Sequence, residues 1–542
     1  MKTSIKFKGS KWLPAVMAAA VLTTAGCTKN FEELNTNPAG ITDEQGNADY
    51  ALIASFLSQA QRNIIPEATG TYQLANNLAS DAYAGYLGIP TAFESNSNNL
   101  TYRLVPGWYL AVWNDRYIQA MNPIHRVLEF TQGNELLSDV YAFAKLLKVA
   151  AMHRTADKVG PIIYTKYNQP DANGSIEFDA QPDVYRNFFL DLDTAMTTFK
   201  GLQGQPTSSA LSLSDLGYSS DNYTHLLKLA NSLRLRLAMR VSMVDPELAR
   251  TEGEKALDPA NGGLIEENAD NWMVRLTAQH PLNEITSSWS DTRMAAGIES
   301  YLKGYNDPRL PKMFEKATDP AVEGEYKGIR VGILIDAKSR YENYSKLVPQ
   351  EPLMQLFTAA ETWFLKAEAG LRGWSNAGDV KTNYETGVRR SFQKYDLSGV
   401  EDYLADDTST PAPYVDPKSQ TPGAHDIPAD SPYLSDITIK WDDAASNDEK
   451  LERIITQKWL AIFPDGDEAW AEYRRTGYPI QFPVVVNYSN GAIPTVPGIR
   501  RLPYAQREYD SNSAGVARAV ELLGGPDNGG TRLWWDVEDK SF

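Results

Sequence analysis

Apolar side chains recur every three or four residues in several long stretches of this chain. The stretches are residues 143–150, 226–241, 353–371 and 448–463. This spacing places the apolar residues on one face of an α-helix. The period-two alternation of a β-strand is confined to residues 329–335 and 482–486. We therefore predict a mostly α fold, with few short strands and an irregular, loop-rich part.

Residues 365–395 have the pattern of two antiparallel helices with a glycine-rich turn between them. Gly373-Trp374 and Gly378-Asp379 mark the turn, and small residues stand where the two helices would touch. A pair of antiparallel helices within about 34 residues resembles one tetratricopeptide repeat. The pattern predicts a scaffold built from such helix pairs.

The amino terminus has the pattern of a secreted lipoprotein. A lysine-rich start is followed by a short apolar stretch, Trp12 to Val21, and by small residues before Cys27. We predict a signal peptide over residues 1–26, lipid attachment at Cys27 and a polar tether over residues 27–47. An ordinary signal peptide with a coincidental cysteine is the alternative. The rest, residues 48–542, is predicted to be a single domain with a long loop excursion at about 401–447.

Composition excludes several classes of function. The chain has 542 residues, a formal net charge of -17, one cysteine and five histidines. The charge argues against nucleic-acid binding, and so few cysteines and histidines leave no multi-cysteine or histidine-based metal site. Because no nucleotide-binding or hydrolase motif is present, we predict no cofactor, no metal and no catalytic residue. A pair of carboxylates needs no local motif, so a glycoside hydrolase stays open as an alternative.

The aromatic residues point toward a binding surface. Twelve Trp and 28 Tyr stand against 17 Phe, and Trp and Tyr combine a flat apolar face with a polar tip. Sugar rings stack on such faces, while their hydroxyl groups need polar partners. The candidate ligand-binding residues lie outside the strongest helical periods, with packing in the core as the alternative for each; they are Asp81, Tyr83, Tyr86, Trp289, Arg293, Tyr341 and Tyr344.

Other tryptophans and a row of basic residues are assigned structural roles. Five tryptophans fall on or beside apolar helical faces and are predicted to belong to the core; they are Trp363, Trp459, Trp470, Trp534 and Trp535. Lys228, Arg234, Arg236 and Arg240 line one helix, and we expect exposed ion pairs with an acidic neighbour. Asp467 is expected to cap the helix that runs through Arg474.

Several long blocks resemble the SusD/RagB family, in the order in which that family carries them. The blocks are YTHLLKLANSLRLRLAMR at 223–240, ETWFLKAEAGLRGW at 361–374, ITQKWLAIFPDGDEAWAEYRRTGY at 455–478 and GIRRLPYAQREY at 498–509. The segment that begins at Cys27 and the closing Trp534-Trp535-Asp536 are similar too. The resemblance therefore extends from Cys27 to the carboxyl terminus.

The resemblance implies a fold, a location and a function. It implies about four tetratricopeptide-like helix pairs and a lipoprotein anchored through Cys27 in the outer membrane, facing the cell exterior. It implies capture of oligosaccharides or peptides without cleavage, and their delivery to a SusC-like TonB-dependent transporter. By position it points to the same seven candidate residues. A repeat scaffold that binds only proteins is a further alternative.

Overall fold

The computed structural model describes residues 50–212 and 222–542. The predicted signal peptide, Cys27 and the tether lie outside the described residues. The chain divides into two compact units, residues 1–53 and 54–542. The first helix of the described residues, α4 (Ala51–Arg62), begins in the first unit and ends in the second. The second unit holds all the elements described below.

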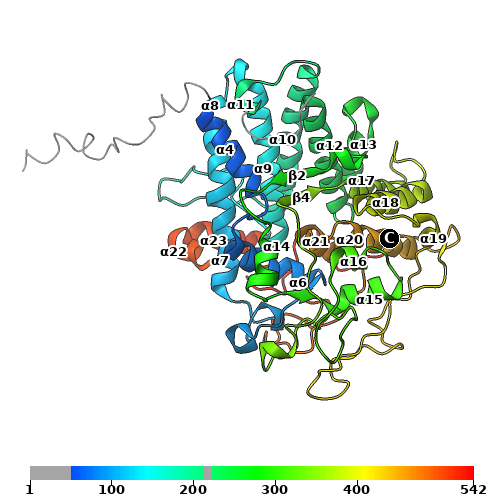
Figure 1. Cartoon of the computed structure of the whole chain (residues 1–542). Helices are drawn as coiled ribbons and strands as arrows, with labels where there is room; N and C mark the ends of the chain where they lie inside the picture. The colour runs from blue at the N-terminus through cyan, green and yellow to red at the C-terminus, as the bar shows by residue number, and fades with distance from the viewer. Residues whose placement is uncertain (1–49, 213–221) are drawn as a thin grey trace, which may run out of the picture. The chain divides into compact units, whose positions relative to one another are not determined.

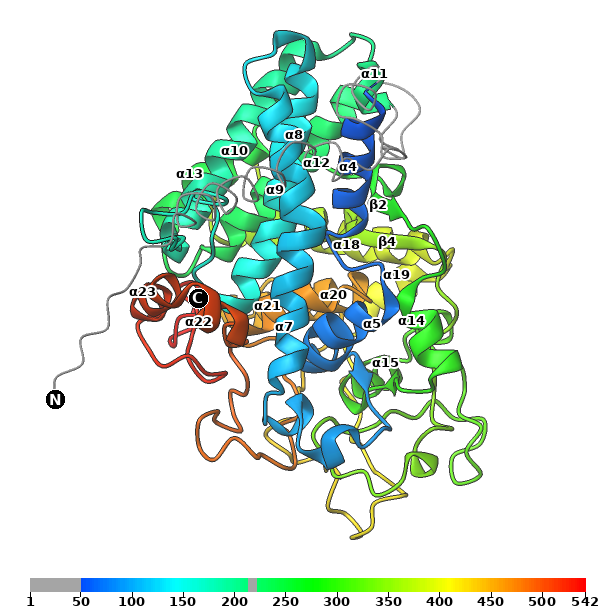
Figure 2. The same cartoon turned by 90° about the vertical axis from the view of Figure 1, so that its left-hand side faces the viewer.

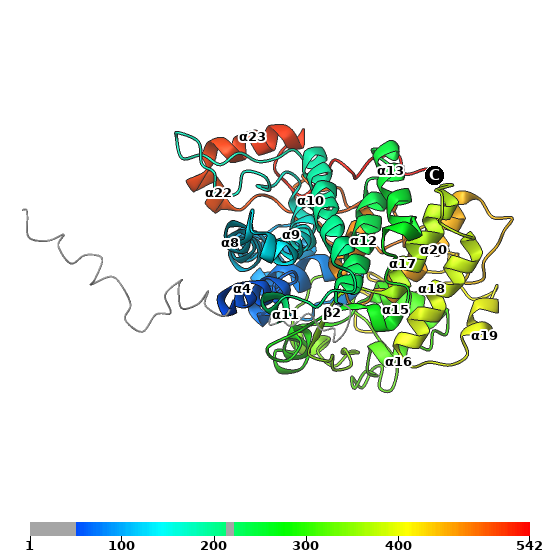
Figure 3. The same cartoon turned by 90° about the horizontal axis from the view of Figure 1, so that it is seen from above.

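Long helices make up one part of the second unit, and most of them pack against a long helix that neighbours them in sequence, as predicted (Figure 1). Their bounds are α8 (Asn122–Thr131), α9 (Ser138–Val159), α10 (Gln181–Leu202), α12 (Asn222–Arg240), α13 (Pro246–Leu257), α17 (Ala359–Leu371), α18 (Val380–Lys394), α20 (Asn447–Ala461) and α21 (Gly466–Thr476). Seen from above, the pairs follow one another in a row from α8 to α20 (Figure 3). The mostly helical fold is confirmed.

Other helices connect and flank this row. They are α5 (Thr69–Tyr72), α6 (Asp81–Tyr83), α7 (Pro106–Asp115), α11 (Ser209–Ser212), α14 (Pro281–Asn283), α15 (Ala296–Gly304), α16 (Leu310–Met313), α19 (Val400–Ala405), α22 (Gln506–Ser511) and α23 (Ser513–Leu523). Wider π-helical turns, η1 (Gln73–Ser80) and η4 (Arg116–Met121), continue α5 and α7. No helix among the described residues has the length and apolar character needed to cross a membrane.

Local side-chain hydrogen bonds set where the long helices begin. Thr358 accepts from the backbone N–H of Glu361 and starts α17, while Ser446 and Glu449 form a reciprocal capping box at the start of α20. These bonds satisfy N–H groups that have no partner within the first helical turn. The cap of α21 differs from the prediction. Asp465, and not Asp467, accepts from the N–H of Glu468.

The strands are short and lie elsewhere than predicted. Antiparallel pairs join β1 (Leu87–Gly88) to β3 (Arg293–Met294) and β2 (Trp272–Arg275) to β4 (Leu353–Phe357). Residues 329–335 and 482–486 are not strands, apart from one isolated bridge at Ile329. Residues 353–357, expected to start the helix of α17, form β4 instead. The backbone groups of these residues hydrogen-bond to β2, and this pairing prevails over the helix that the spacing of their apolar side chains predicts.

Loops make up the opposite end of the second unit (Figures 1 and 2). They include the predicted excursion at 401–447, which begins within α19 and contains no strand, only an isolated bridge between Tyr414 and Ile427. This segment is more than a surface excursion. Tyr414, Ile437 and Ile439 are buried, and the hydroxyl of Tyr414 donates to the carbonyl of Gly328 over 2.9 Å.

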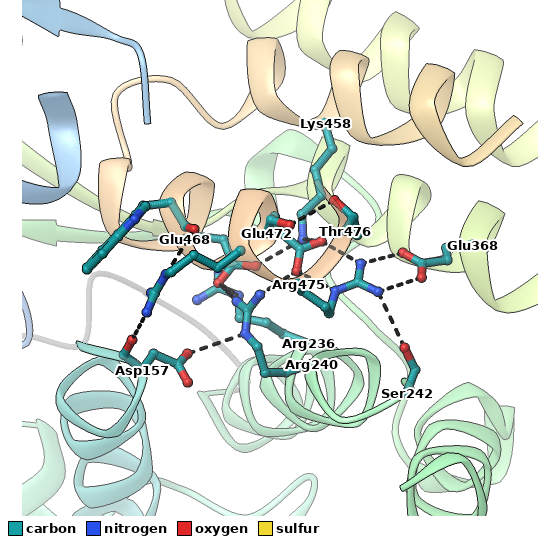
Figure 4. A network of polar contacts seen from close by, with 12 residues as sticks. Asp157, Arg236, Arg240, Ser242, Glu368, Lys458, Glu468, Glu472, Arg475 and Thr476 are labelled. Carbon is teal, nitrogen blue, oxygen red and sulfur yellow. Dashed lines mark hydrogen bonds and ion pairs between the residues drawn. The ribbon is translucent and has the colours of Figure 1, made fainter. Parts of the chain in front are cut away.

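Arg236 and Arg240 of α12 form buried ion pairs, which corrects the expectation of exposed ones (Figure 4), whereas Lys228 keeps a partly exposed pair with Asp270 over 2.7 Å. Arg236 donates to Glu361 over 2.6 Å, and Arg240 donates to Glu468 over 2.5 Å. Both arginines are at most 2% exposed. The acidic partners come from α17 and α21 together. The sequence shows the charged residues, but it does not show that α12, α17 and α21 meet and bury them.

Three of the five tryptophans assigned to the core are fully buried: Trp459, Trp470 and Trp535 are 2%, 0% and 0% exposed. Trp363 and Trp534 are half-buried. The guanidinium of Arg474 lies over the ring of Trp470, with its central carbon 3.6 Å from the centre of that ring. The same aromatic core therefore also packs against the buried charges.

Candidate functional site

Three loops at the loop-rich end form a surface around Trp289, which we call the loop surface. It consists of residues 89–96, 287–292 and 333–340. Trp289 is half-buried, and Leu334 is 46% exposed. Glu94, Ser95, Asn96 and Ser290 all have positive φ angles, between 49° and 67°. Such backbone conformations are unfavourable for residues with a Cβ and cluster at functional sites.

Polar contacts hold the Trp289 loop against its neighbours. The ammonium of Lys338 donates to the carbonyl of Trp289 over 2.5 Å and to Asp291 over 2.7 Å. Asp291 also accepts from the hydroxyl of Thr91 over 2.5 Å and from the amide of Gln73 over 3.1 Å. The carboxylate of Asp291 thus joins all three loops to the helical part.

A second set of bonds fixes the loop of positive-φ residues. Asn96 donates to the carbonyl of Ile335 over 3.0 Å and accepts from its N–H over 2.9 Å. Phe93, half-buried, meets the buried Trp108 edge to face at 5.8 Å. These contacts order a surface on which aromatic and apolar groups stand beside a lysine and a carboxylate. Such a surface can stack a flat apolar ligand face and hydrogen-bond its rim.

The first predicted group lies in the core. Asp81 and Tyr86 are 0% exposed, and Tyr83 is 8% exposed. Tyr86 stacks on Trp459 at 5.2 Å, and its hydroxyl donates to the carbonyl of that residue. Asp81 accepts from the hydroxyl of Tyr72 over 3.2 Å. Burial, with Asp467 nearby, raises the pKa of Asp81.

The other predicted residues are mostly internal as well. Arg293, 4% exposed, donates to the carbonyls of Glu342 and Thr286, the latter over 3.1 Å. Tyr341 and Tyr344 are 1% and 2% exposed, and their hydroxyls donate to Asp416 over 2.8 and 3.4 Å. Trp289 alone among the seven candidates keeps more than a small part of its side chain exposed.

The structure therefore separates the seven candidates. Arg293, Tyr341 and Tyr344 support the loops beneath Trp289, whereas Asp81, Tyr83 and Tyr86 join the helical core. Sequence reasoning did not single out Thr91, Phe93 or Lys338 of the loop surface. The Gly88-Ile89-Pro90 turn and the Asn/Ser run after it were the only signal for this loop. Among the described residues, no group of three His, Cys, Asp or Glu side chains is placed to hold a metal ion.

Comparisons with known proteins bear on the same fold. The family described as "SusD-like: Susd and RagB outer membrane lipoprotein" matches residues 33–536. A solved structure described as a chitin-binding SusD homologue from Flavobacterium johnsoniae is 41% identical, with a TM-score of 0.85, over 90% of this chain and 100% of its own.

Two further solved structures agree. A SusD homologue from Bacteroides vulgatus is 35% identical with a TM-score of 0.83, over 91% of this chain and 99% of its own. A SusD homologue from Bacteroides uniformis is 36% identical with a TM-score of 0.80, over 90% of this chain and 99% of its own. No curated protein sequence matches the chain. With nearly the whole sequence matched by the family and by three structures of the same fold, the chain belongs to the SusD/RagB family of outer membrane lipoproteins.

Proposed function

We propose that this protein is a cell-surface lipoprotein that binds oligosaccharides and delivers them, uncleaved, to a SusC-like TonB-dependent transporter in the outer membrane. The observation that carries the proposal is the match to the SusD/RagB family over residues 33–536. Cys27 is the proposed point of lipid attachment, with the domain facing the cell exterior. Several acyl chains on one residue give stable anchoring, whereas one chain gives only marginal binding.

For the ligand, we propose oligosaccharides of the chitin type, taken up on the loop surface. The chitin-binding relative from Flavobacterium johnsoniae supports this class, because it is 41% identical and fully covered by this chain. The half-buried ring of Trp289 offers a stacking face. Lys338 and Asp291 lie within hydrogen-bonding distance of each other beside it, and polar groups of this kind suit the hydroxyl and N-acetyl groups of such a sugar.

Replacing Trp289 with Ala tests the site. One stacked ring contributes about 1 kcal/mol, so we expect affinity for chitin oligomers to fall about fivefold or more. Isothermal titration with chitin, cellulose and starch oligomers measures both affinity and preference. Trp363→Ala is the matched control, because Trp363 is half-buried on α17 and donates to the carbonyl of Glu266.

Equal affinity in Trp289→Ala and the wild type would remove the loop surface from the proposal. Failure to bind any oligosaccharide would favour the scaffold alternative, in which the protein binds only other proteins. Release of reducing sugar by the purified protein would favour the hydrolase alternative. Co-purification of a large outer-membrane barrel with the tagged protein tests the proposed partner.

A further inference from the structure

A cavity of about 330 Å³ lies away from the loop surface. It is bordered by β4, by α16, by the end of α18 and by the turn between α20 and α21. Its buried lining includes Tyr72, Asn76 and His280, while Lys312 and Glu351 at its rim are exposed. The volume falls within the range of small-molecule pockets, about 300–1,000 Å³. None of the residues that line it belongs to the loop surface.

Lys394, at the end of α18, is the unusual basic residue of this cavity. Its ammonium donates to two neutral acceptors, Oε1 of Gln355 over 2.5 Å and the carbonyl of Phe463 over 3.1 Å. Within residues 50–212 and 222–542, no carboxylate forms an ion pair with it. The carboxylate of Asp465 lines the same cavity but is bound by Arg154 through two contacts of 2.8 Å. Lys394 is half-buried, and a cation partly removed from water without a counterion is costly.

The electrostatic surroundings of Lys394 agree with this geometry. Burial lowers the pKa of Lys394 to about 7, with Arg309 contributing and Asp465 opposing. A negatively charged ligand would restore the charged form of this lysine. Lys312 at the rim adds a second positive charge, and Glu351 is the one exposed carboxylate among the residues that line the cavity.

Asn76 supplies an unused acceptor in the same cavity. It is 2% exposed, and its amide group donates to Asp467 over 3.0 Å. Its carbonyl oxygen Oδ1 is buried and accepts no hydrogen bond from any described residue. A buried acceptor without a donor is costly, so such groups are rare in folded proteins. A ligand with a hydroxyl or ammonium group would satisfy it.

His280 adds a donor. Its Nδ1 accepts from the N–H of Leu282 over 3.2 Å, which places the proton of the neutral ring on Nε2. The ring meets Tyr72 edge to face at 6.0 Å. The residues that line the cavity therefore include an ammonium group without a counterion, an imidazole N–H and a carbonyl oxygen without a donor.

We propose that this cavity binds a small organic anion whose carboxylate pairs with Lys394 and whose hydroxyl or ammonium group donates to Oδ1 of Asn76. Two kinds of molecule carry both groups: an acidic sugar such as glucuronate, and a free amino acid such as glycine. The site stands on its own residues and does not depend on the proposed oligosaccharide-binding surface.

Isothermal titration of the purified protein with glucuronate, glycine, acetate and glucose tests the proposal. We expect saturable binding of either glucuronate or glycine, and the one that binds identifies the ligand as an acidic sugar or an amino acid. Acetate, which lacks a hydroxyl or ammonium group, and glucose, which lacks a carboxylate, should bind at least tenfold more weakly. Lys394→Met should weaken the bound acid about tenfold or more, since a charge-assisted bond is lost. Lys312→Ala should weaken it severalfold at most.

Lys346→Ala is the control, because Lys346 is paired with Glu315 and does not line the cavity. Thermal unfolding of each variant without ligand guards against misfolding. Lys394→Met should unfold at the same temperature or higher, since it removes a half-buried charge that has no counterion. The absence of saturable binding, equal affinity for acetate, or unchanged affinity in Lys394→Met would overturn the proposal. A markedly lower unfolding temperature of Lys394→Met would assign Lys394 a structural role and overturn it as well.

Discussion

At the residue scale, the start of α21 depends on a close approach that only glycine permits. Gly466 lies against Asp81 of α6, and a Cβ on Gly466 would stand 2.7 Å from the Cα and 2.8 Å from the backbone nitrogen of Asp81. Backbone atoms at this distance cannot move aside as the end of a flexible side chain can. The same contact explains why Asp81 is buried and not available to a ligand.

We expect Gly466→Ala to lower the free energy of unfolding by about 1–3 kcal/mol, the usual cost of overpacking a core. Gly201→Ala is the control, because Gly201 lies in α10 and a Cβ there meets nothing within 4 Å. That change should leave stability equal or raise it by about 0.5–1 kcal/mol, since alanine favours the helix. Urea unfolding measures both. Equal stability of the two variants would show that α6 and α21 can separate without cost.

At the element scale, α21 is joined to α12, α17 and α20 by buried ion pairs (Figure 4). Arg475 of α21, 0% exposed, donates to Glu368 of α17 over 2.6 Å and to Glu472 over 2.8 Å. Lys458 of α20 donates to Glu468 over 3.0 Å. Each charge has at least one opposite partner, so the network as a whole avoids an unpaired buried charge. These pairs fix which helices meet and in which register.

Arg475→Ala should therefore lower the free energy of unfolding by about 3–5 kcal/mol, because it leaves buried carboxylates with too few donors. The matched control is Arg250→Ala on α13, whose exposed pair with Glu254 spans 2.9 Å. An exposed pair is worth about 0–1 kcal/mol, so the control should unfold almost as the wild type does. Chemical denaturation compares the two. A loss of less than 1 kcal/mol in Arg475→Ala would contradict the role given to the network.

At the scale of the whole molecule, the same network makes stability depend on pH. Burial disfavours the charged forms of Asp467 and Glu468. The positive charges of Lys158 and Arg154 outweigh this effect at Asp467, and those of Arg240 and Lys458 outweigh it at Glu468. Both pKa values fall to about 2. In the unfolded chain the pKa values of these carboxyl groups are about 4. Their stabilising contribution is therefore complete above about pH 5 and is lost as the pH falls toward 2.

The unfolding temperature should accordingly stay level from pH 7 to about 5 and fall steeply below about pH 4. Calorimetry at a series of pH values and constant ionic strength measures it. Asp467→Asn should flatten the acid limb, since the substituted side chain no longer titrates. An unfolding temperature that holds from pH 7 to pH 3 in the wild type would contradict this assignment.

The proposed anchor gives a prediction for the whole protein in its cell. Cys27→Ser removes the thiol that would carry lipid, so the protein should move from the membrane pellet to the soluble fraction. Ser58→Ala, on α4, is a control that leaves the anchor intact. Fractionation followed by immunoblotting compares the two. A Cys27→Ser variant that stays in the membrane pellet without a co-purifying transporter would contradict lipid anchoring at Cys27.

The helical periods alone were enough to predict α9, α12, α17 and α20, because an apolar face every three or four residues is determined by the local sequence. The same reasoning placed β4 in a helix, since its five residues gain their partners from β2, about 80 positions earlier. For the site, the aromatic census found Trp289 but also gathered Tyr83 and Tyr86, whose rings are buried against Trp470 and Trp459. Composition identifies rings but does not show which of them face solvent.

By itself, the sequence determined the mostly helical class, the helix pair at residues 365–395 and the acidic and basic residues that would have to pair. Tertiary structure alone decided that those charges are buried, that Trp289 is half-buried while Tyr341 and Tyr344 are fully buried, and that Lys394 and Asn76 line one cavity. The physical reason is that helix formation follows from neighbours three and four positions apart, whereas burial and charge pairing follow from segments hundreds of residues apart that meet only in the folded chain.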